Sequence, residues 1–150
     1  MTRSSRYCGV LAFHDDAVVL VREEHPTWGG EFWNVPSGRV EEHESPAQGA
    51  ARELIEETGL VAAPEKLQLL SLVTTTHDEG ESRSWNYGVE VASTTLLVDD
   101  PDGIIREARW FARGEAVELL STLPYQPLAE PAVAFLSGRA PPVARWSYRR

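Results

Sequence analysis

Three glutamates in one short segment have the residue type and spacing to hold a divalent cation. Glu53, Glu56 and Glu57 lie in the stretch GRVEEHESPAQGAARELIEETGL, residues 38–60. On a helix this spacing gathers the carboxylates on one side, where each like-charged pair destabilises the helix by roughly 0.2–0.5 kcal/mol. On charge alone, a solvated acidic face is the simpler explanation. The spacing favours instead an oxygen-rich site for a hard cation such as Mg²⁺ or Mn²⁺.

The residues around these glutamates predict the helix that positions them. Ser45 and Gln48 fit a capping box, and Pro46 fits the first helical position. Gly59 is typical of a C-terminal stop. Small and apolar residues recur between them at helical spacing and predict a stripe packed on a sheet, namely Ala47, Ala50, Ala51, Leu54 and Thr58. We expect the three glutamates on the opposite side, together with Gly49, which would leave room there for a bound phosphate.

The rest of the chain predicts a mixed sheet covered by helices. Apolar and β-branched stretches predict strands at residues 6–13, 17–22, 66–76, 85–98 and 106–112. A solvated loop is expected at 77–84 and a bulge at Gly88. Helical patterns cover 114–121 and 126–138, and residues 139–150 are predicted to form an irregular C-terminal tail. Because strands and helices do not alternate regularly, we expect one mixed sheet covered by helices. No internal repeat or interdomain linker stands out, so we expect one domain over residues 1–150.

Composition argues against several classes of protein. The 150 residues suit a single globular domain, and no apolar run approaches the roughly 18–20 residues of a membrane helix. The formal net charge of −9 opposes binding to a nucleic-acid polymer. The single cysteine, Cys8, excludes an internal disulfide and suits a reducing compartment, so we expect a cytoplasmic protein.

Gly38, Glu44 and the segment RELIEETGL (52–60) together resemble the complete signature of the Nudix hydrolases, as in MutT-like proteins. The matching positions are Gly38, Glu44, Arg52, Glu53, Leu54, Glu56, Glu57, Gly59 and Leu60. The preceding WNVPSG segment is similar to the family's entry to this signature, with Ser37 in place of its first glycine. The resemblance implies an α/β fold, the α/β/α sandwich with a central mixed β-sheet.

The resemblance also implies a reaction and a metal. Family members hydrolyse a phosphoanhydride bond of a nucleoside diphosphate linked to another group, and they use metal-activated water. The implied cofactor is Mg²⁺, with Mn²⁺ as a substitute. The implied ligands are Glu56 and Glu57, the Gly38 carbonyl, and Glu53, which serves as ligand or general base.

Other matching positions have supporting roles in the family. Glu44 and Arg52 are expected to hold the loop and helix in register, with Arg52 near the catalytic carboxylates. In some relatives the general base lies outside the signature, and Glu107, in the late segment EARWF (107–111), occupies such an acidic position. A solvated strand end explains Glu107 equally well.

The substrate stays open at this stage among a nucleoside triphosphate, a nucleotide sugar and an ADP-ribose-like compound. Trp28 and Phe32 precede the signature and are candidates for stacking on a base. Arg22 and Arg39 flank the expected cleft and are candidates for phosphate binding. Surface ion pairs account for these arginines equally well.

Two alternatives belong to other functional classes. A non-catalytic nucleotide-sensing Nudix module would be expected to carry an additional DNA-binding domain or a damaged signature. A diphosphate isomerase of the same fold needs a catalytic cysteine beside the metal site, whereas Cys8 lies in the first predicted strand, far along the chain from the signature. A homodimer built through the N-terminal strands or the C-terminal region is compatible with the sequence.

Overall fold

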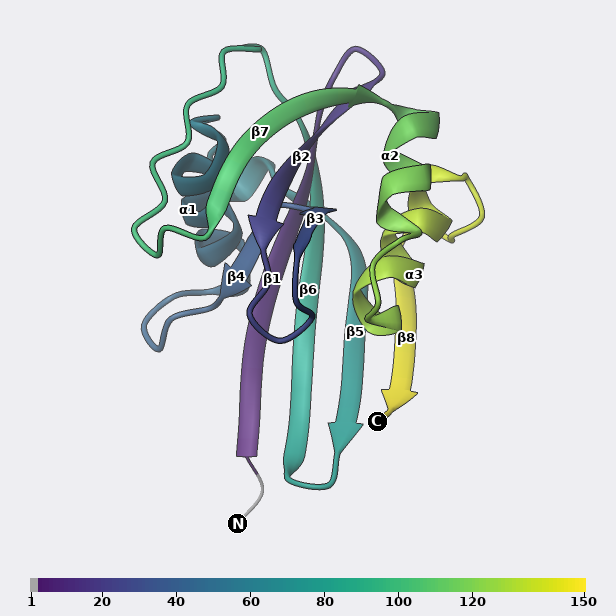
Figure 1. The fold of residues 1–150 in the computed structure, drawn as a ribbon. Helices are drawn as coiled ribbons and strands as arrows, with labels where there is room; N and C mark the ends of the chain where they lie inside the picture. The colour runs from purple at the N-terminus through teal and green to yellow at the C-terminus, as the bar shows by residue number, and fades with distance from the viewer. Residues whose placement is uncertain (1–2) are drawn as a thin grey trace.

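A central sheet with helices on both faces forms the body of the protein (Figure 1), as seen in a computed structural model that describes residues 3–150. The strands are β1 (Arg3–His14), β2 (Ala17–Glu24), β3 (Glu31–Asn34), β4 (Ser37–Arg39), β5 (Gln68–His77), β6 (Gly80–Glu90), β7 (Ile105–Ala112) and β8 (Ala144–Arg149). The helices are α1 (Pro46–Thr58), a 3₁₀ turn η1 (Pro64–Lys66), α2 (Arg113–Leu120) and α3 (Gln126–Leu136). Helix α1 covers one face, and α2 and α3 cover the other, which confirms the predicted α/β/α sandwich.

The sheet is mixed and divides between its first two strands. Its order is β3-β2-β1-β6-β5-β8, with parallel pairing of β1 to β6 and of β5 to β8. Strands β1 and β2 pair only beside their turn, where Phe13 faces Val18 and His14 faces Ala17. Beyond that point β1 pairs with β4 and β2 pairs with β3 and β7. The divergence of β1 and β2 places the segment 35–38 between them, since the Val10 N–H donates to the Pro36 carbonyl at 3.0 Å.

Alternate residues of β1 are buried in two different cores. Val10 packs with Leu54 of α1 on one face, and Leu11 packs with Leu120 of α2 on the other. Because both faces of the strand are covered, β1 reads as a continuous apolar run rather than as an alternating pattern. Among residues 3–150, no helix has the length and apolar character needed to cross a membrane.

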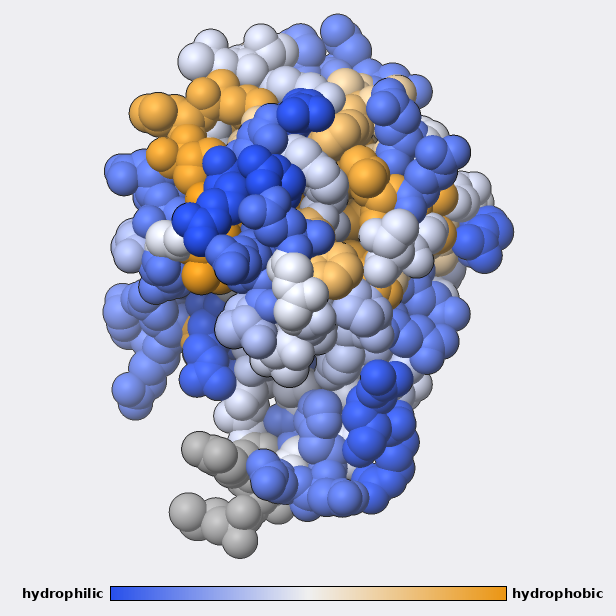
Figure 2. All heavy atoms as spheres, viewed as in Figure 1, coloured by the Kyte–Doolittle hydropathy of each residue, from blue (hydrophilic) through white to orange (hydrophobic). Residues whose placement is uncertain are grey.

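Two predicted irregular segments are strands in the structure. Residues 144–149 of the predicted tail form β8, which pairs in parallel with β5. Strand β6 begins at Gly80, inside the predicted loop 77–84, and ends at Glu90, before the predicted limit. In Figure 2 the lower part of the surface, where β6 begins, is largely hydrophilic. The first residues of β6 (GESRS) carry no apolar pattern, and pairing with distant strands makes them extended. In β8, by contrast, Ala144, Trp146 and Tyr148 alternate with exposed polar residues, a strand pattern that was present in the sequence of the predicted tail.

The bulge predicted at Gly88 lies instead in the facing strand. The register of β5 against β6 shifts between Leu69 and Ser71, which leaves Leu70 as the extra residue. A Cβ atom at Gly88 would lie 2.9 Å from Leu70 Cδ1. Gly88 is therefore the residue that accommodates the bulge rather than the bulge itself.

Candidate active site

Helix α1 begins and ends where the sequence predicts. The Gln48 N–H donates to Ser45 Oγ at 3.1 Å, and the Ser45 N–H donates to Gln48 Oε1 at 2.9 Å, which completes the capping box. Gly59 adopts φ 79°, and its N–H donates to the Ile55 carbonyl at 2.8 Å. A residue with a side chain would be strained in this left-handed conformation. Local sequence alone thus determines the helix that carries the glutamates.

The three glutamates do not all lie on a solvated side, which argues against the simpler explanation of a solvated acidic face. Glu53 and Glu57 are only 7% and 4% exposed, whereas Glu56 is partly exposed. Strand β4 covers them, because the Ser37 N–H donates to Glu57 Oε1 at 3.2 Å. The backbone of Gly38 lies so close to the Glu53 carboxylate that any Cβ atom would overlap it. Glycine at this position is therefore needed for close approach rather than for a turn.

Gly49 also has a different role from the one we predicted. It is buried, and a Cβ atom there would lie 3.2 Å from Cys8 Sγ and 3.6 Å from Val40 Cα. Gly49 lets α1 pack closely on β1 and the segment after β4. This packing leaves no opening for a phosphate at the position.

Arg52 connects the helix to the loop that precedes it. Its Nε and Nη2 donate to the two oxygens of Glu44 at 2.7 and 2.9 Å, and Nη2 also donates to the Arg39 carbonyl at 2.9 Å. Its Nη1 donates to Glu53 Oε1 at 2.9 Å and to Glu56 Oε2 at 3.3 Å. The bidentate pair with Arg52 lowers the pKa of Glu44. Arg52 thus bridges both halves of the signature.

Glu53 and Glu57 form a buried, hydrogen-bonded carboxyl pair. Burial, then the hydrogen bond and charge of Glu53, raise the pKa of Glu57 to about 10, although the Ser37 N–H opposes this shift. Burial also raises the pKa of Glu53, against the hydrogen bonds from Glu57 and Arg52. Without a cation the pair therefore holds a proton at neutral pH.

This pair fits a divalent cation. Among residues 3–150 no three acidic, histidine or cysteine side chains are already arranged as a metal site, and Glu56 is engaged by Arg52. Two buried carboxylates beside the Gly38 backbone nevertheless form the oxygen-rich, charge-deficient environment that a hard cation stabilises. Glu53 and Glu57 are the side chains that could hold such a cation, while the Gly38 carbonyl accepts from Cys8 Sγ at 3.7 Å.

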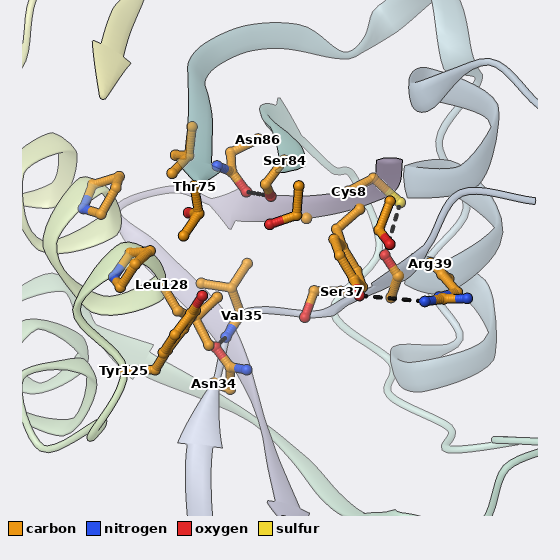
Figure 3. Close-up of a pocket in the computed structure, with 18 of the residues that line it drawn as sticks. Cys8, Asn34, Val35, Ser37, Arg39, Thr75, Ser84, Asn86, Tyr125 and Leu128 are labelled. Carbon is orange, nitrogen blue, oxygen red and sulfur yellow. Dashed lines mark hydrogen bonds between the residues drawn. The ribbon is translucent and has the colours of Figure 1, made fainter. Parts of the chain in front are cut away.

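A cavity of about 1140 Å³ opens where β1 and β2 diverge. Glu53 and Glu57 do not line it themselves, but Ser37 and Gly38, which contact them, do. Figure 3 shows Ser37 and Arg39 at the end near α1, and Tyr125 and Leu128 at the end near α3, with Asn34 between them. The cavity exceeds the typical range of small-molecule sites and is large enough for a nucleotide. Its two ends differ in character, one adjoining the carboxyl pair and the other aromatic.

Two of the four predicted substrate contacts line this cavity. Trp28 lines it and stacks on His25, with ring centroids 3.7 Å apart. Arg39 lines it beside Tyr7, to whose hydroxyl its Nη2 donates at 3.5 Å. Phe32 packs edge-on against Trp28 with centroids 5.6 Å apart and supports it from behind. Arg22 is instead ion-paired to Glu31 and Glu107.

Glu107 is held by arginines on the outer part of the sheet. Arg109 Nη2 lies 2.6 Å from its Oε2, and Arg22 Nη2 lies 3.3 Å from its Oε1. The hydrogen bond from Arg109, followed by that from Arg22, lowers the pKa of Glu107. A carboxylate with a lowered pKa is a weaker base, so these contacts favour the non-catalytic strand-end explanation for Glu107 and the ion-pair explanation for Arg22.

Several residues that line the cavity were not predicted from the sequence. Cys8 lines the cavity, and its Sγ donates to the Gly38 carbonyl at 3.7 Å, although the two residues are far apart in sequence. Burial raises the pKa of the Cys8 thiol to about 12, so it stays protonated. Glu23, Asn34 and Tyr125 also line the cavity. Asn34 could have been identified from its place in WNVPSG, the segment that resembles the family's entry to the signature. Glu23 could not, because an acidic residue at the end of a strand is not by itself a sign of a binding site.

Comparison with known proteins assigns the class of protein. A family model described as the NUDIX domain matches residues 3–131, and the chain belongs to the Nudix family. The crystal structure of a NUDIX hydrolase from Nitrosomonas europaea superposes with a TM-score of 0.77 at 16% identity, covering 100% of this chain and 81% of that one. The solution structure of the E. coli ORF135 protein gives a TM-score of 0.67 at 19% identity, covering 91% and 88%. These likenesses confirm the Nudix fold.

A curated relative is more similar in sequence. The Mycobacterium tuberculosis protein named "Putative 8-oxo-dGTP diphosphatase 3" is 33% identical over 109 residues, which are 70% of this chain and 49% of the relative. The chain thus spans about half the length of this relative.

Proposed function

We propose that this protein is a Mg²⁺-dependent pyrophosphohydrolase that cleaves a phosphoanhydride bond of a nucleoside triphosphate. The observation that carries the proposal is the buried Glu53–Glu57 pair behind Gly38 and Ser37, at one end of a nucleotide-sized cavity. The name of the M. tuberculosis relative, a putative 8-oxo-dGTP diphosphatase, supports a triphosphate over the nucleotide sugar and ADP-ribose-like alternatives.

The residues of the proposed metal site are Glu53, Glu57 and the Gly38 carbonyl, with Glu56 as a further ligand. A bound Mg²⁺ or Mn²⁺ supplies the positive charge that activates water and offsets the charge of the phosphates. The Ser37 N–H orients Glu57, and Arg52 orients Glu53. Glu53 is the proposed proton acceptor for the attacking water, which is one of the two roles that the family resemblance implies for it.

The remaining residues bind and align the substrate. Arg39 lies at the same end of the cavity as Ser37 and offers a guanidinium to the phosphates. Trp28 offers a stacking surface, which His25 holds on one face. Arg52 and Glu44 keep helix and loop in one position, so they act on the reaction through Glu53 rather than on the substrate.

A substrate panel tests the proposal. Purified protein is incubated with nucleoside triphosphates, a nucleotide sugar and ADP-ribose, with Mg²⁺ or Mn²⁺ or with EDTA, and both products are identified by chromatography. We expect metal-dependent release of a nucleoside monophosphate and pyrophosphate, strongly reduced in Glu57→Gln and unchanged in Glu65→Gln, an exposed control. Absence of turnover on the whole panel, or full activity of Glu57→Gln, would refute it.

The same experiment separates the alternatives. A non-catalytic nucleotide-sensing module would bind nucleotides without turnover. The isomerase needs a reactive cysteine, which the buried, protonated Cys8 does not provide. A cytoplasmic location and a homodimer stay predictions.

A further inference from the structure

Glu23 is a largely buried residue that lines the cavity, and one of its two carboxyl oxygens has no hydrogen-bond partner in the described residues. Glu23 is 8% exposed and Asn34 is 2% exposed, and both line the cavity. Asn34 Nδ2 donates to Glu23 Oε1 at 3.0 Å, while Asn34 Oδ1 accepts from the Val35 N–H at 2.7 Å. Within residues 3–150, Glu23 Oε2 has no hydrogen-bond donor. The Asn34 amide is thus held by the backbone, and it fixes which Glu23 oxygen remains available.

Glu23 Oε2 is open to the cavity, since among residues 3–150 the one fully buried side-chain polar atom without a partner is Trp146 Nε1. Burial of a carboxyl group without a cationic partner is costly, and a hydrogen bond from a neutral amide offsets only part of that cost. Within the described part of the chain no arginine or lysine bonds to Glu23, in contrast to Glu44 and Glu107. A glutamine at position 23 would satisfy Asn34 equally well without the charge. A carboxylate oxygen that is open to the cavity therefore points to a ligand that donates hydrogen bonds.

The position of Glu23 along the cavity indicates which part of a nucleotide it would contact. Phosphates belong at the end formed by Ser37 and Arg39, next to the carboxyl pair of α1. Trp28 and Tyr125 line the aromatic end, with ring centroids 6.3 Å apart. Asn34 lies between these ends in Figure 3, so its partner Glu23 is placed to meet the nucleoside rather than the phosphates.

We propose that Glu23 determines base specificity, with Oε2 accepting from the N–H groups on the pairing edge of a guanine-type base. The inference rests on the proposed function. Guanine presents two adjacent donors on this edge, the ring N1–H and the 2-amino group. Adenine and cytosine present an acceptor nitrogen beside their amino group, and a carboxylate oxygen repels that nitrogen. A site built around such a donor contact rejects a base that lacks it.

Glu23→Gln tests the inference, because Asn34 fixes its geometry. If the new amide oxygen keeps the bond from Asn34, the amide NH₂ faces the cavity, and an acceptor is replaced by a donor. Glu24→Gln removes the same charge from the next residue, which is exposed and paired with Arg106. It is the matched control. Binding of dGMP and dAMP is measured by calorimetry without metal, and kcat/KM is measured for dGTP and dATP with Mg²⁺.

We expect the wild type and Glu24→Gln to bind dGMP roughly 10- to 100-fold more tightly than dAMP, the range of one hydrogen bond to a charged group. In Glu23→Gln this ratio should fall to about one or reverse. An equal loss for both nucleotides, or a wild type without preference, overturns the inference and leaves the proposed function standing. If the binding preference appears but no nucleotide is hydrolysed, only the proposed function fails. Because the wild-type ratio alone can refute the inference, an unstable Glu23→Gln protein does not remove the test.

Discussion

Glu57→Gln is expected to stabilise the metal-free protein while abolishing its activity. Burial and the neighbouring Glu53 raise the pKa of Glu57 from 4.5 to about 10. Below pH 4.5 the folded and unfolded chains both hold the proton, so this group does not affect stability. Between pH 4.5 and about 10 the folded chain keeps a proton that the unfolded chain releases, and the wild type loses stability as pH rises.

The size of the effect at neutral pH follows from this difference. Each pH unit above the unfolded pKa costs about 1.4 kcal/mol, so the wild type loses about 3 kcal/mol at pH 7. In Glu57→Gln neither state titrates at this position. The new amide can still accept from the Ser37 N–H and donate to Glu53. For a chain of this size the gain corresponds to roughly 6–12 °C in Tm.

The assay is urea unfolding with EDTA at several values of pH between 4.5 and 8, with Glu65→Gln as the exposed control. The difference between Glu57→Gln and wild type should be near zero at pH 4.5 and should grow toward about 3 kcal/mol at pH 7. Mg²⁺ at saturating concentration should stabilise the wild type and leave the variant unchanged. A variant less stable than wild type at pH 7 without metal, or a difference that does not vary with pH, would refute the reasoning.

Three further substitutions probe the site. Arg52→Ala should lower the free energy of unfolding by roughly 2–4 kcal/mol, since Glu44 would lose its bidentate partner, and denaturant unfolding measures this. Gly38→Ala should fold but displace the Glu53 carboxylate, with about a 100-fold loss of kcat; unchanged kcat would contradict the close approach. Glu107→Gln should keep kcat within about twofold, and a fall of 10²–10⁴ would instead identify Glu107 as the general base.

Helix α1 shows how far sequence alone reaches. Its capping box, its left-handed Gly59 and its apolar stripe are interactions among residues at most four apart, so they can be predicted from local pattern. The segments that cover the helix cannot be predicted from local pattern in the same way. The burial of Glu53 and Glu57 depends on β4, which reaches the helix only because β1 and β2 diverge. From sequence alone a solvated acidic face was the simpler explanation, and this burial argues against it.

By itself the sequence determined the family, the main helix and the residues of the proposed metal site, because a fixed spacing on one helix encodes them. Only the tertiary structure decided which strands complete the sheet, and it alone brought Cys8 to Gly38 and Glu23 to Asn34. Strand pairing and cavity lining join residues far apart in the chain, and no local pattern specifies such partners. Burial of a charge is likewise a property of what covers it, which a sequence does not display.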